Sequence, residues 1–355
     1  MKTLLAFIPF FLLLFNYGFA SEQQTDFKAL MIKKYVDGDF HGGVLYSDSK
    51  GNIHKLALGL ANPDTGEALT TEHRFAINSM GKMFTAILIM QLVEQNKVSL
   101  DDTLSKHLPE HAHPNAPEIT IHQLLSHRSG IPDSLISQMR GVIPWDLSED
   151  EEINAVYSLP LDFDPGSGFH YTNTGYTLLG RVVKKYREGN YEDILSRYIF
   201  EPLNMKDSAI TNNKNMTAYF SSDGKVEEYI DDMAYVGSGQ GAASLMDMYR
   251  FLSALGSDRL LSGESWEIMF TPHSFPSEVP EGAWPPPHQY PYGYGFSLMP
   301  VAAEGEEYKL VGHGGAGYGS NFAGRFLGTK KVVVIYNNMM KNPVLPDVLR
   351  FVASQ

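Results

Sequence analysis

The chain has 355 residues, of which 43% are hydrophobic and 12% aromatic, so a disordered polymer is excluded and a sizeable core is available. Its formal charge is −13, with 28 Lys and Arg against 41 Asp and Glu. No nucleic-acid partner is expected, because phosphate binding needs clustered cations. Cysteine is absent, which excludes disulfides, cysteine nucleophiles and thiolate metal sites.

Residues 1–20 are predicted to be a cleavable signal peptide. A single positive charge precedes an apolar run that is short for a hydrocarbon layer about 30 Å thick. Gly18 and Ala20 supply the small residues that signal peptidase requires before Ser21. We therefore expect a periplasmic or secreted protein, residues 21–355, without a membrane span. An uncleaved membrane anchor is the alternative.

The first predicted elements are strands, followed by a buried helix. Strand-forming runs separated by turn residues predict strands at Gly43–Tyr46, Ile53–Leu60 and Phe75–Asn78. Met80–Val93 is apolar on all sides, which indicates a helix enclosed by the rest of the protein. Residues 100–230 are expected to be mainly helical and rich in loops.

Strands return towards the end of the chain, after a predicted helix at Ser244–Ala254. They are expected at Tyr294–Leu298, Tyr308–Val311, Asn321–Phe326 and Lys331–Asn337. This order predicts a single α+β domain with one sheet built from both chain ends, residues 21–98 and 235–355, and a helical lobe inserted at residues 99–234. The proline-rich stretch 272–291 is expected to be a stiff loop, either a surface connection or the rim of a site.

The first candidate catalytic pair is Ser79 and Lys82, at the head of the buried helix. Their spacing of three residues places both on one helix face. A hydroxyl is a weak nucleophile until a base removes its proton, and an amine in apolar surroundings is able to be that base. The helix N-terminus also offers N–H groups to an oxyanion. The alternative is Ser79 as a helix cap and Lys82 as a residue that reaches the surface.

The second candidate segment is Tyr171–Asn173, between a glycine-rich turn and an amphipathic helix. Tyr171 is suited to relay a proton between nucleophile and leaving group, and Asn173 to bond a substrate amide or Lys82. The alternative is that Asn173 caps the helix and Tyr171 packs in the core.

The third candidate segment is His313–Gly315, which follows a predicted strand. Its glycines allow a substrate backbone to approach a strand edge closely. The N–H of Ala316 is a candidate second oxyanion donor, beside that of Ser79. The alternative is a glycine-rich turn with an incidental histidine.

In this order, the three motifs resemble those of the serine β-lactamase and penicillin-binding-protein superfamily, in the branch of class C β-lactamases, DD-peptidases and related esterases. Further similar stretches are Phe75–Leu108, Leu124–Gly130, Pro165–Gly180 and Glu201–Met205. The resemblance implies an antiparallel sheet flanked by helices, an all-helical lobe, an active site between them, and neither a metal nor an organic cofactor.

The resemblance also implies a role for each motif. Ser79 would be acylated, Lys82 would hold or accept its proton, and Tyr171 would serve the proton shuttle. Asn173 would orient the substrate or the lysine. By the same resemblance, His313 and Gly315 would line the strand that docks the substrate.

One residue departs from the family pattern. The third motif begins with His313, where relatives that grip a carboxylate carry Lys, and a neutral imidazole binds a carboxylate weakly near pH 7. Efficient β-lactam turnover is therefore disfavoured. We expect an esterase, D-amino-acid peptidase or DD-carboxypeptidase that works through an acyl-enzyme on a small-molecule or peptidic substrate. The sequence predicts no oligomeric state.

Other functions stay open at this point. They are a penicillin-binding or sensor protein that is acylated without turnover, a true β-lactamase, and a metallohydrolase. The histidines available for a metal are His107, His111, His113, His122 and His127. Pro109 and Pro114 interrupt helical ligand spacing there, which disfavours a metal site. A Ser-His-Asp hydrolase of another fold is disfavoured because the chain has no Gly-x-Ser-x-Gly motif.

Overall fold

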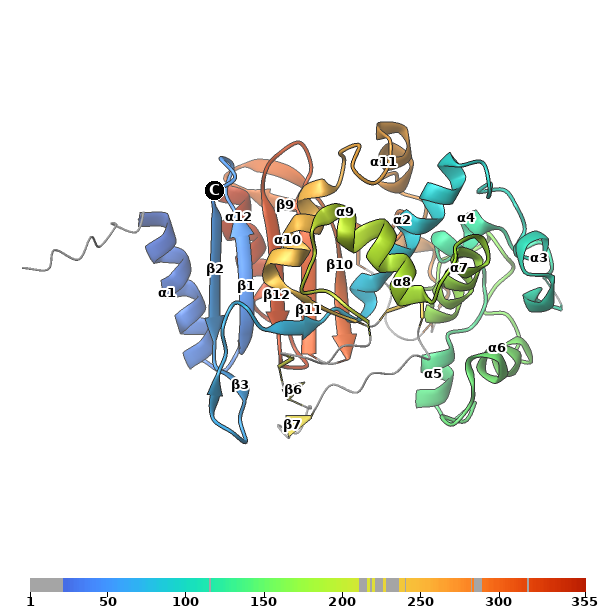
Figure 1. Cartoon of the computed structure of the whole chain (residues 1–355), viewed down its shortest axis with the longest axis horizontal. Helices are drawn as coiled ribbons and strands as arrows, with labels where there is room; N and C mark the ends of the chain where they lie inside the picture. Colours follow the sequence, from blue (N-terminus) through green and yellow to red (C-terminus); the bar gives the residue numbers. More distant parts are fainter. Residues whose placement is uncertain are drawn as a thin grey trace, which may run out of the picture.

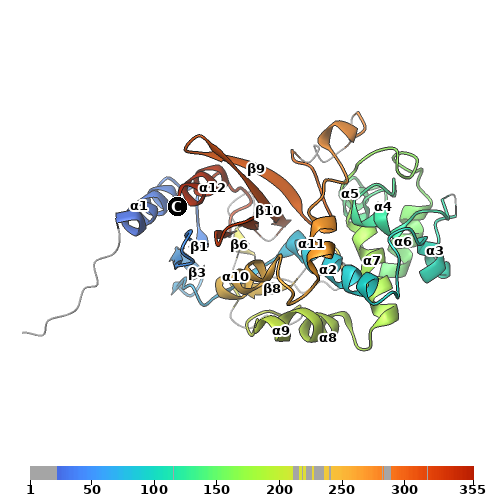
Figure 2. The same cartoon turned by 90° about the horizontal axis from the view of Figure 1, so that it is seen from above.

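The computed structural model (Figures 1 and 2) describes most of the chain after residue 21. The described residues are 22–114, 116–210, 216–217, 219–220, 226–227, 236–239, 241–281, 283, 289–317 and 319–355. The predicted signal peptide, residues 1–20, lies outside them. Across these ranges, no helix combines the length and the apolar character that a bilayer crossing demands.

A six-stranded antiparallel sheet is the centre of the fold, with strand order β2-β1-β12-β11-β10-β9. The strands are β1 (Gly42–Ser47), β2 (Ile53–Leu58), β9 (Ser297–Ala303), β10 (Glu306–Gly317), β11 (Gly319–Phe326) and β12 (Val332–Asn337). Because β1 pairs with β12, both ends of the chain build one sheet. The predicted α+β class with an antiparallel sheet flanked by helices is confirmed.

Alternating side chains of the central strands pack into two separate hydrophobic cores, one on each face of the sheet. In β12, Val333 and Ile335 belong to the core under α1 (Glu22–Val36) and α12 (Leu345–Ser354). Val332, Val334 and Tyr336 belong to the larger core on the opposite face. Successive side chains of a strand point to opposite faces, so β12 is buried on both faces. This explains why Val332–Tyr336 are all apolar or aromatic. The opposite face is covered by α10 (Leu245–Ala254).

The remaining elements are short or lie in the helical part of the chain. The helices are α3 (Leu104–His107), α4 (Ile121–Leu125), α5 (Ser134–Met139), α6 (Glu149–Tyr157), α7 (Asn173–Tyr186), α8 (Tyr191–Leu195), α9 (Glu201–Leu203) and α11 (Gly263–Met269). The short strands are β3 (Leu60–Asn62), β4 (Glu67–Ala68), β5 (Arg74–Ala76), β6 (Tyr219–Phe220), β7 (Val226–Glu227) and β8 (Ala242–Ser244). The lobe boundaries expected near residues 98 and 235 stay a prediction.

Helix α2 (Gly81–Glu94) joins the sheet region to the helical region (Figure 2). Every residue from its start to Met90 is buried. The ring of Phe84 packs edge-on against Phe251 of α10 at 4.6 Å and against Phe200 at 5.6 Å. Because α2 is enclosed by elements from both regions, the residues at its start lie deep between them.

Some predicted strand limits were wrong, and the reasons are physical. β9 extends to Ala303 instead of ending at Leu298, because it is an edge strand and an edge tolerates Pro300. β10 runs through the predicted glycine-rich segment as far as Gly317. The predicted strand Phe75–Asn78 is the short β5, which pairs with β8 outside the main sheet.

Candidate active site

Ser79 lies on a tight turn between β5 and α2. The turn is a 3-10 helix, Asn78–Met80, in which the N–H of Met80 donates to the carbonyl of Ile77 at 3.1 Å. Asn78 has a φ of 47°, the left-handed region that costs a non-glycine residue backbone strain. This reversal places Ser79 at the wall of a cavity, ahead of the helix instead of within it.

Lys82 is buried directly behind Ser79. Its Nζ is 3.4 Å from Ser79 Oγ, donates to Asn173 Oδ1 at 2.6 Å, and also donates to the carbonyl of Ser238. Its side chain is 0% exposed. Burial lowers the pKa of Lys82 to about 7, against the opposing effect of the nearby Asp133 carboxylate. A substantial share of the molecules therefore carries a neutral amine beside the hydroxyl at neutral pH.

Tyr171 covers the other side of this pair. Its ring centroid is 4.7 Å from Lys82 Nζ, and Tyr171 lines the same cavity as Ser79. Burial raises the pKa of Tyr171 above its ordinary value of 10, although Ser79 acts in the opposite direction. Tyr171 is thus a phenol at neutral pH, able to donate a proton, while Lys82 is the group able to accept one.

His127 holds the backbone on which Tyr171 is carried. Its Nδ1 accepts from the N–H of Thr172 at 3.1 Å, and its carbonyl accepts from the N–H of His170 at 3.1 Å. Its ring lies 4.4 Å from the Tyr171 ring, and the residue has a left-handed φ of 59°. His127 therefore fixes the position of the Tyr171 phenol. The sequence around His127 gave no indication of this role.

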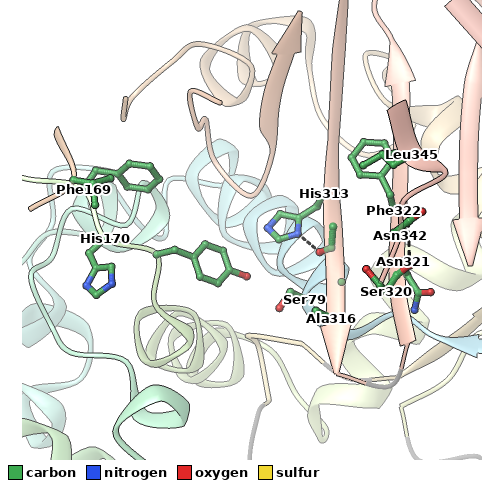
Figure 3. A pocket seen from close by; sticks show the side chains of 14 residues that line it. Ser79, Phe169, His170, His313, Ala316, Ser320, Asn321, Phe322, Asn342 and Leu345 are labelled. Atoms are coloured by element: carbon green, nitrogen blue, oxygen red, sulfur yellow. Dashed lines mark hydrogen bonds between the residues drawn. The ribbon is translucent and has the colours of Figure 1, made fainter. Parts of the chain in front are cut away.

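His313 is 2% exposed, and its imidazole is engaged inside the protein (Figure 3). Nδ1 is 2.5 Å from the carbonyl oxygen of Gly314, and Nε2 is 3.0 Å from the hydroxyl of Tyr292. A carbonyl only accepts, so Nδ1 carries a hydrogen towards Gly314, while the hydroxyl of Tyr292 occupies Nε2. With both nitrogens bonded, His313 does not provide the free cation that would bind a substrate carboxylate.

The glycine at position 315 allows β10 to approach the turn that carries Ser79. A Cβ added there would lie 2.5 Å from the carbonyl oxygen of Ile77. On the next strand, Asn321 donates to the carbonyl of Ala76 at 2.7 Å. These contacts place Ala316 and Ser79 on the wall of the same cavity, as two potential backbone donors to an oxyanion require.

The cavity has a volume of about 370 Å³, and Figure 3 shows the side chains that line it. Its lining residues are Ser79, Phe169, His170, Tyr171, Val279, His313, Gly314, Gly315, Ala316, Ser320, Asn321, Phe322, Asn342 and Leu345. Within the described part of the chain, none of them is an Asp, Glu, Lys or Arg. The proline-rich stretch 272–291 contributes Val279, so it forms part of the rim.

The predicted site residues come together from three separate parts of the chain. They are Ser79, Lys82, Tyr171, Asn173, His313, Gly315 and Ala316. Five of them line the cavity, and the other two, Lys82 and Asn173, lie behind it as a bonded pair. Lys82 does not reach the surface, contrary to the alternative interpretation of that residue.

The histidines considered for a metal are spread over separate contacts. His107 bonds Asp102 and Tyr186, His111 contacts Arg181, and His122 contacts Tyr294. His113 packs against Tyr157, and His127 serves the backbone described above. In the ranges that the structure describes, no three His, Asp or Glu side chains gather in a way that suits a metal ion.

Comparison with known proteins gives consistent matches. A family model described as Beta-lactamase matches residues 28–354. Penicillin-binding protein 4 of Amycolatopsis lactamdurans is 33% identical over 189 residues, which is 52% of this chain and 48% of that protein. Esterase EstB of Burkholderia gladioli is 29% identical over 181 residues, 47% of this chain and 44% of that protein. The matches thus span about half the length of these relatives.

A solved structure shares the fold over nearly the whole chain. It is the D-amino acid amidase of Ochrobactrum anthropi SV3 complexed with L-phenylalanine amide, with a TM-score of 0.79 and 21% identity. The alignment covers 94% of this chain and 98% of the amidase chain. At this identity the likeness concerns the fold alone.

Proposed function

Because the chain belongs to the Beta-lactamase family, we propose that it is a serine hydrolase that cleaves an ester or amide through an acyl-enzyme on Ser79. The observation that carries the proposal is the buried contact between Lys82 Nζ and Ser79 Oγ at 3.4 Å. Because the pKa of Lys82 is lowered to about 7, part of the amine is unprotonated at neutral pH and is able to accept the proton of the Ser79 hydroxyl.

Acylation begins with proton transfer from Ser79 to Lys82. Ser79 Oγ bonds to the carbonyl carbon, its proton moves to Lys82 Nζ, and the carbonyl electron pair moves to the oxygen. The N–H groups of Ser79 and Ala316 stabilise that oxyanion. When the adduct collapses, the bond to the leaving group breaks, and the leaving group takes the proton of Tyr171, which is replaced from the Lys82 ammonium.

Deacylation repeats these steps with water. Water adds to the acyl carbon and gives a proton to Lys82. The bond between the acyl carbon and Ser79 Oγ then breaks, and the proton returns to Ser79. The net reaction converts an ester or amide and water into an acid and an alcohol or amine. No step needs a metal or an organic cofactor.

The cavity favours a substrate that is uncharged around the reacting carbonyl. Its apolar lining includes Phe169, Val279, Phe322 and Leu345, and His313 has both nitrogens bonded within the protein. A carboxylate would lose its hydration there, and none of the described lining residues is a Lys or an Arg that would pair with it. An esterase or amidase is favoured over a β-lactamase, and the name of the EstB relative agrees with an esterase.

The test uses the purified protein with p-nitrophenyl butyrate, D-phenylalanine amide and nitrocefin. We expect product in excess of one equivalent per chain and an acyl adduct on Ser79 in a peptide mass spectrum. Ser79→Ala is expected to abolish both, and Ser320→Ala, which removes another hydroxyl of the same cavity, is expected to retain them. Full activity of Ser79→Ala would refute the proposal. A single burst without turnover would favour the sensor alternative.

We also propose that residues 1–20 direct export and are removed. Expression in a Gram-negative host is expected to give a periplasmic or secreted product whose first residue is Ser21. Intact mass spectrometry of that product measures the cleavage point. A product that keeps the first 20 residues would contradict this part of the proposal.

A further inference from the structure

Asp133 lies where two helices of the helical region begin, and it bonds to both. Its Oδ1 accepts from the N–H of Ile136 at 2.8 Å, which caps α5. Its Oδ2 accepts from the N–H of Asn173, the first residue of α7. The residue is 4% exposed. Both carboxyl oxygens thus accept backbone N–H groups, and the N-terminus of α7 is a favourable place for negative charge.

The same turn is tied to α7 a second time. The N–H of Ser134 donates to Thr174 Oγ1 at 2.9 Å, and that hydroxyl donates to the carbonyl of Pro132 at 3.0 Å. The start of α7 is therefore held on the turn before α5 through two neighbouring residues. Asn173, so held, is the residue whose side-chain oxygen accepts from Lys82.

We propose that Asp133 is a positioning residue for the reaction at Ser79: it holds Asn173 against the amine of Lys82 and thereby fixes the distance between that amine and the nucleophile. This inference rests on the proposed function. Asp133 does not line the catalytic cavity, so it acts through Asn173 and Lys82 without touching the substrate there. None of the three sequence motifs includes Asp133.

The charge of Asp133 gives the proposal a measurable signature. It raises the pKa of Lys82, whereas burial, the larger effect, lowers it. Among the residues that the structure describes, the other groups that face the amine carry no charge: the rings of Tyr171 and Tyr176, the hydroxyl of Ser79, the amide of Asn173 and the carbonyl of Ser238. Around Asp133 itself lies Glu152, which is buried and whose pKa is raised by burial and then by Asp133. Asp133 also lines a second cavity, whose other charged or titratable lining residues are Arg140, Asp162, His170 and Glu281.

The test compares the pH dependence of Ser79 acylation in the full-length protein and in Asp133→Asn. The variant amide retains one acceptor of the two and loses the charge. We expect acylation to slow about 10- to 100-fold, because the amine and hydroxyl are no longer held together. We also expect the acidic limb of the pH–rate profile to move to lower pH, because burial then acts on Lys82 without the opposing carboxylate.

Two further variants separate positioning from a loss of folding. Asp133→Ser keeps a residue that caps α5 but loses the charge and the reach to Asn173, so it is expected to show the same two effects. Asp133→Glu keeps the charge and is expected to restore the position of the limb. The matched control is Glu152→Gln, which removes a buried acid that does not bond Asn173. It is expected to leave rate and limb unchanged.

The outcomes distinguish this inference from the proposed function. If the wild-type protein forms no acyl adduct on Ser79, the proposed function itself fails. If the wild-type protein is acylated, and Asp133→Asn and Asp133→Ser are acylated at the same rate with the same acidic limb, only the role of Asp133 fails. A slower rate with an unmoved limb in both variants would assign Asp133 a purely structural part and also overturn the inference.

Discussion

In the part of the chain that the structure describes, two lysines are buried, one on each side of the sheet, and their surroundings differ in kind. Lys331 lies at the start of β12, 5% exposed, where its Nζ donates to the carbonyl of Ala353 and lies 4.7 Å from the ring centroid of Tyr308. Lys82 also donates to a backbone carbonyl and faces tyrosine rings, but it has Ser79 and Asn173 beside it as well.

Burial lowers the pKa of both amines, so desolvation alone does not identify a catalytic base. What sets Lys82 apart is a hydroxyl within 3.4 Å that faces a cavity. Lys331 secures the C-terminal helix to the sheet instead. A candidate catalytic lysine is therefore recognised by its partners and by access to substrate, and less by its depth.

The largest expected effect comes from replacing Lys82 with methionine, and the same replacement of Lys331 is its control. Lys82→Met removes the proposed base, so ester hydrolysis is expected to fall by about 10²–10⁴-fold. Lys331→Met keeps the site intact and is expected to retain the wild-type kcat/KM, with any change confined to the melting temperature. Steady-state kinetics with p-nitrophenyl butyrate measure both. Equal losses of activity in the two variants would contradict the assignment of Lys82 as the base and Lys331 as a structural residue.

The next effect concerns Tyr171 and depends on the leaving group. Tyr171→Phe removes the proposed proton donor, and the loss is expected to reach about 10²-fold for an amide. It is expected to be smaller for p-nitrophenyl butyrate, because p-nitrophenolate departs without a proton. Tyr176→Phe is the matched control, since its ring also faces Lys82, at 5.7 Å, while its hydroxyl donates to the carbonyl of Leu125. Identical losses for amide and ester would contradict the donor role.

The smallest expected effect is on the free energy of unfolding and its dependence on pH. Between pH 7 and 9 the unfolded chain keeps Lys82 protonated, whereas the folded chain releases that proton as the pH rises through about 7. The unfolded state then binds more protons, so the free energy of unfolding rises with pH. Relative to Lys82→Met, the wild-type protein is expected to gain about 2 kcal/mol over this window, measured by urea denaturation. A constant difference would show that the amine stays charged.

Much of this site was predictable because its chemistry lies in short segments. Ser79 and Lys82 are three residues apart, and Tyr171 and Asn173 are two apart, so local spacing was enough to group each pair. The residues that position them were not predictable in this way. Asp133 and Asn173 are 40 positions apart, and His127 and Thr172 are 45 apart, so their bonds depend on the tertiary fold. The sequence held one local sign of a role for Asp133, which is that an aspartate after Pro132 is suited to be the N-cap of a helix.

The fold shows the same division between local and tertiary information. The buried helix was placed to within a residue because its apolar run is continuous: Met80–Val93 was expected and Gly81–Glu94 is observed. β10 was cut short at Val311 because Gly312, Gly314 and Gly315 weaken strand propensity. Pairing with β11 and close packing on the Ser79 turn override that propensity. Helices α1 and α12 were not predicted at all.

The central claim is that a neutral Lys82 takes the proton of Ser79. It is tested most directly by the rate of Ser79 acylation in the wild-type protein between pH 5 and 9, followed by rapid quench and intact mass. The account predicts a rate that rises with pH along a single limb centred near pH 7, because the lowered pKa of Lys82 lies there. An acylation rate that does not change across this range, or an acyl group on a residue other than Ser79, would contradict it.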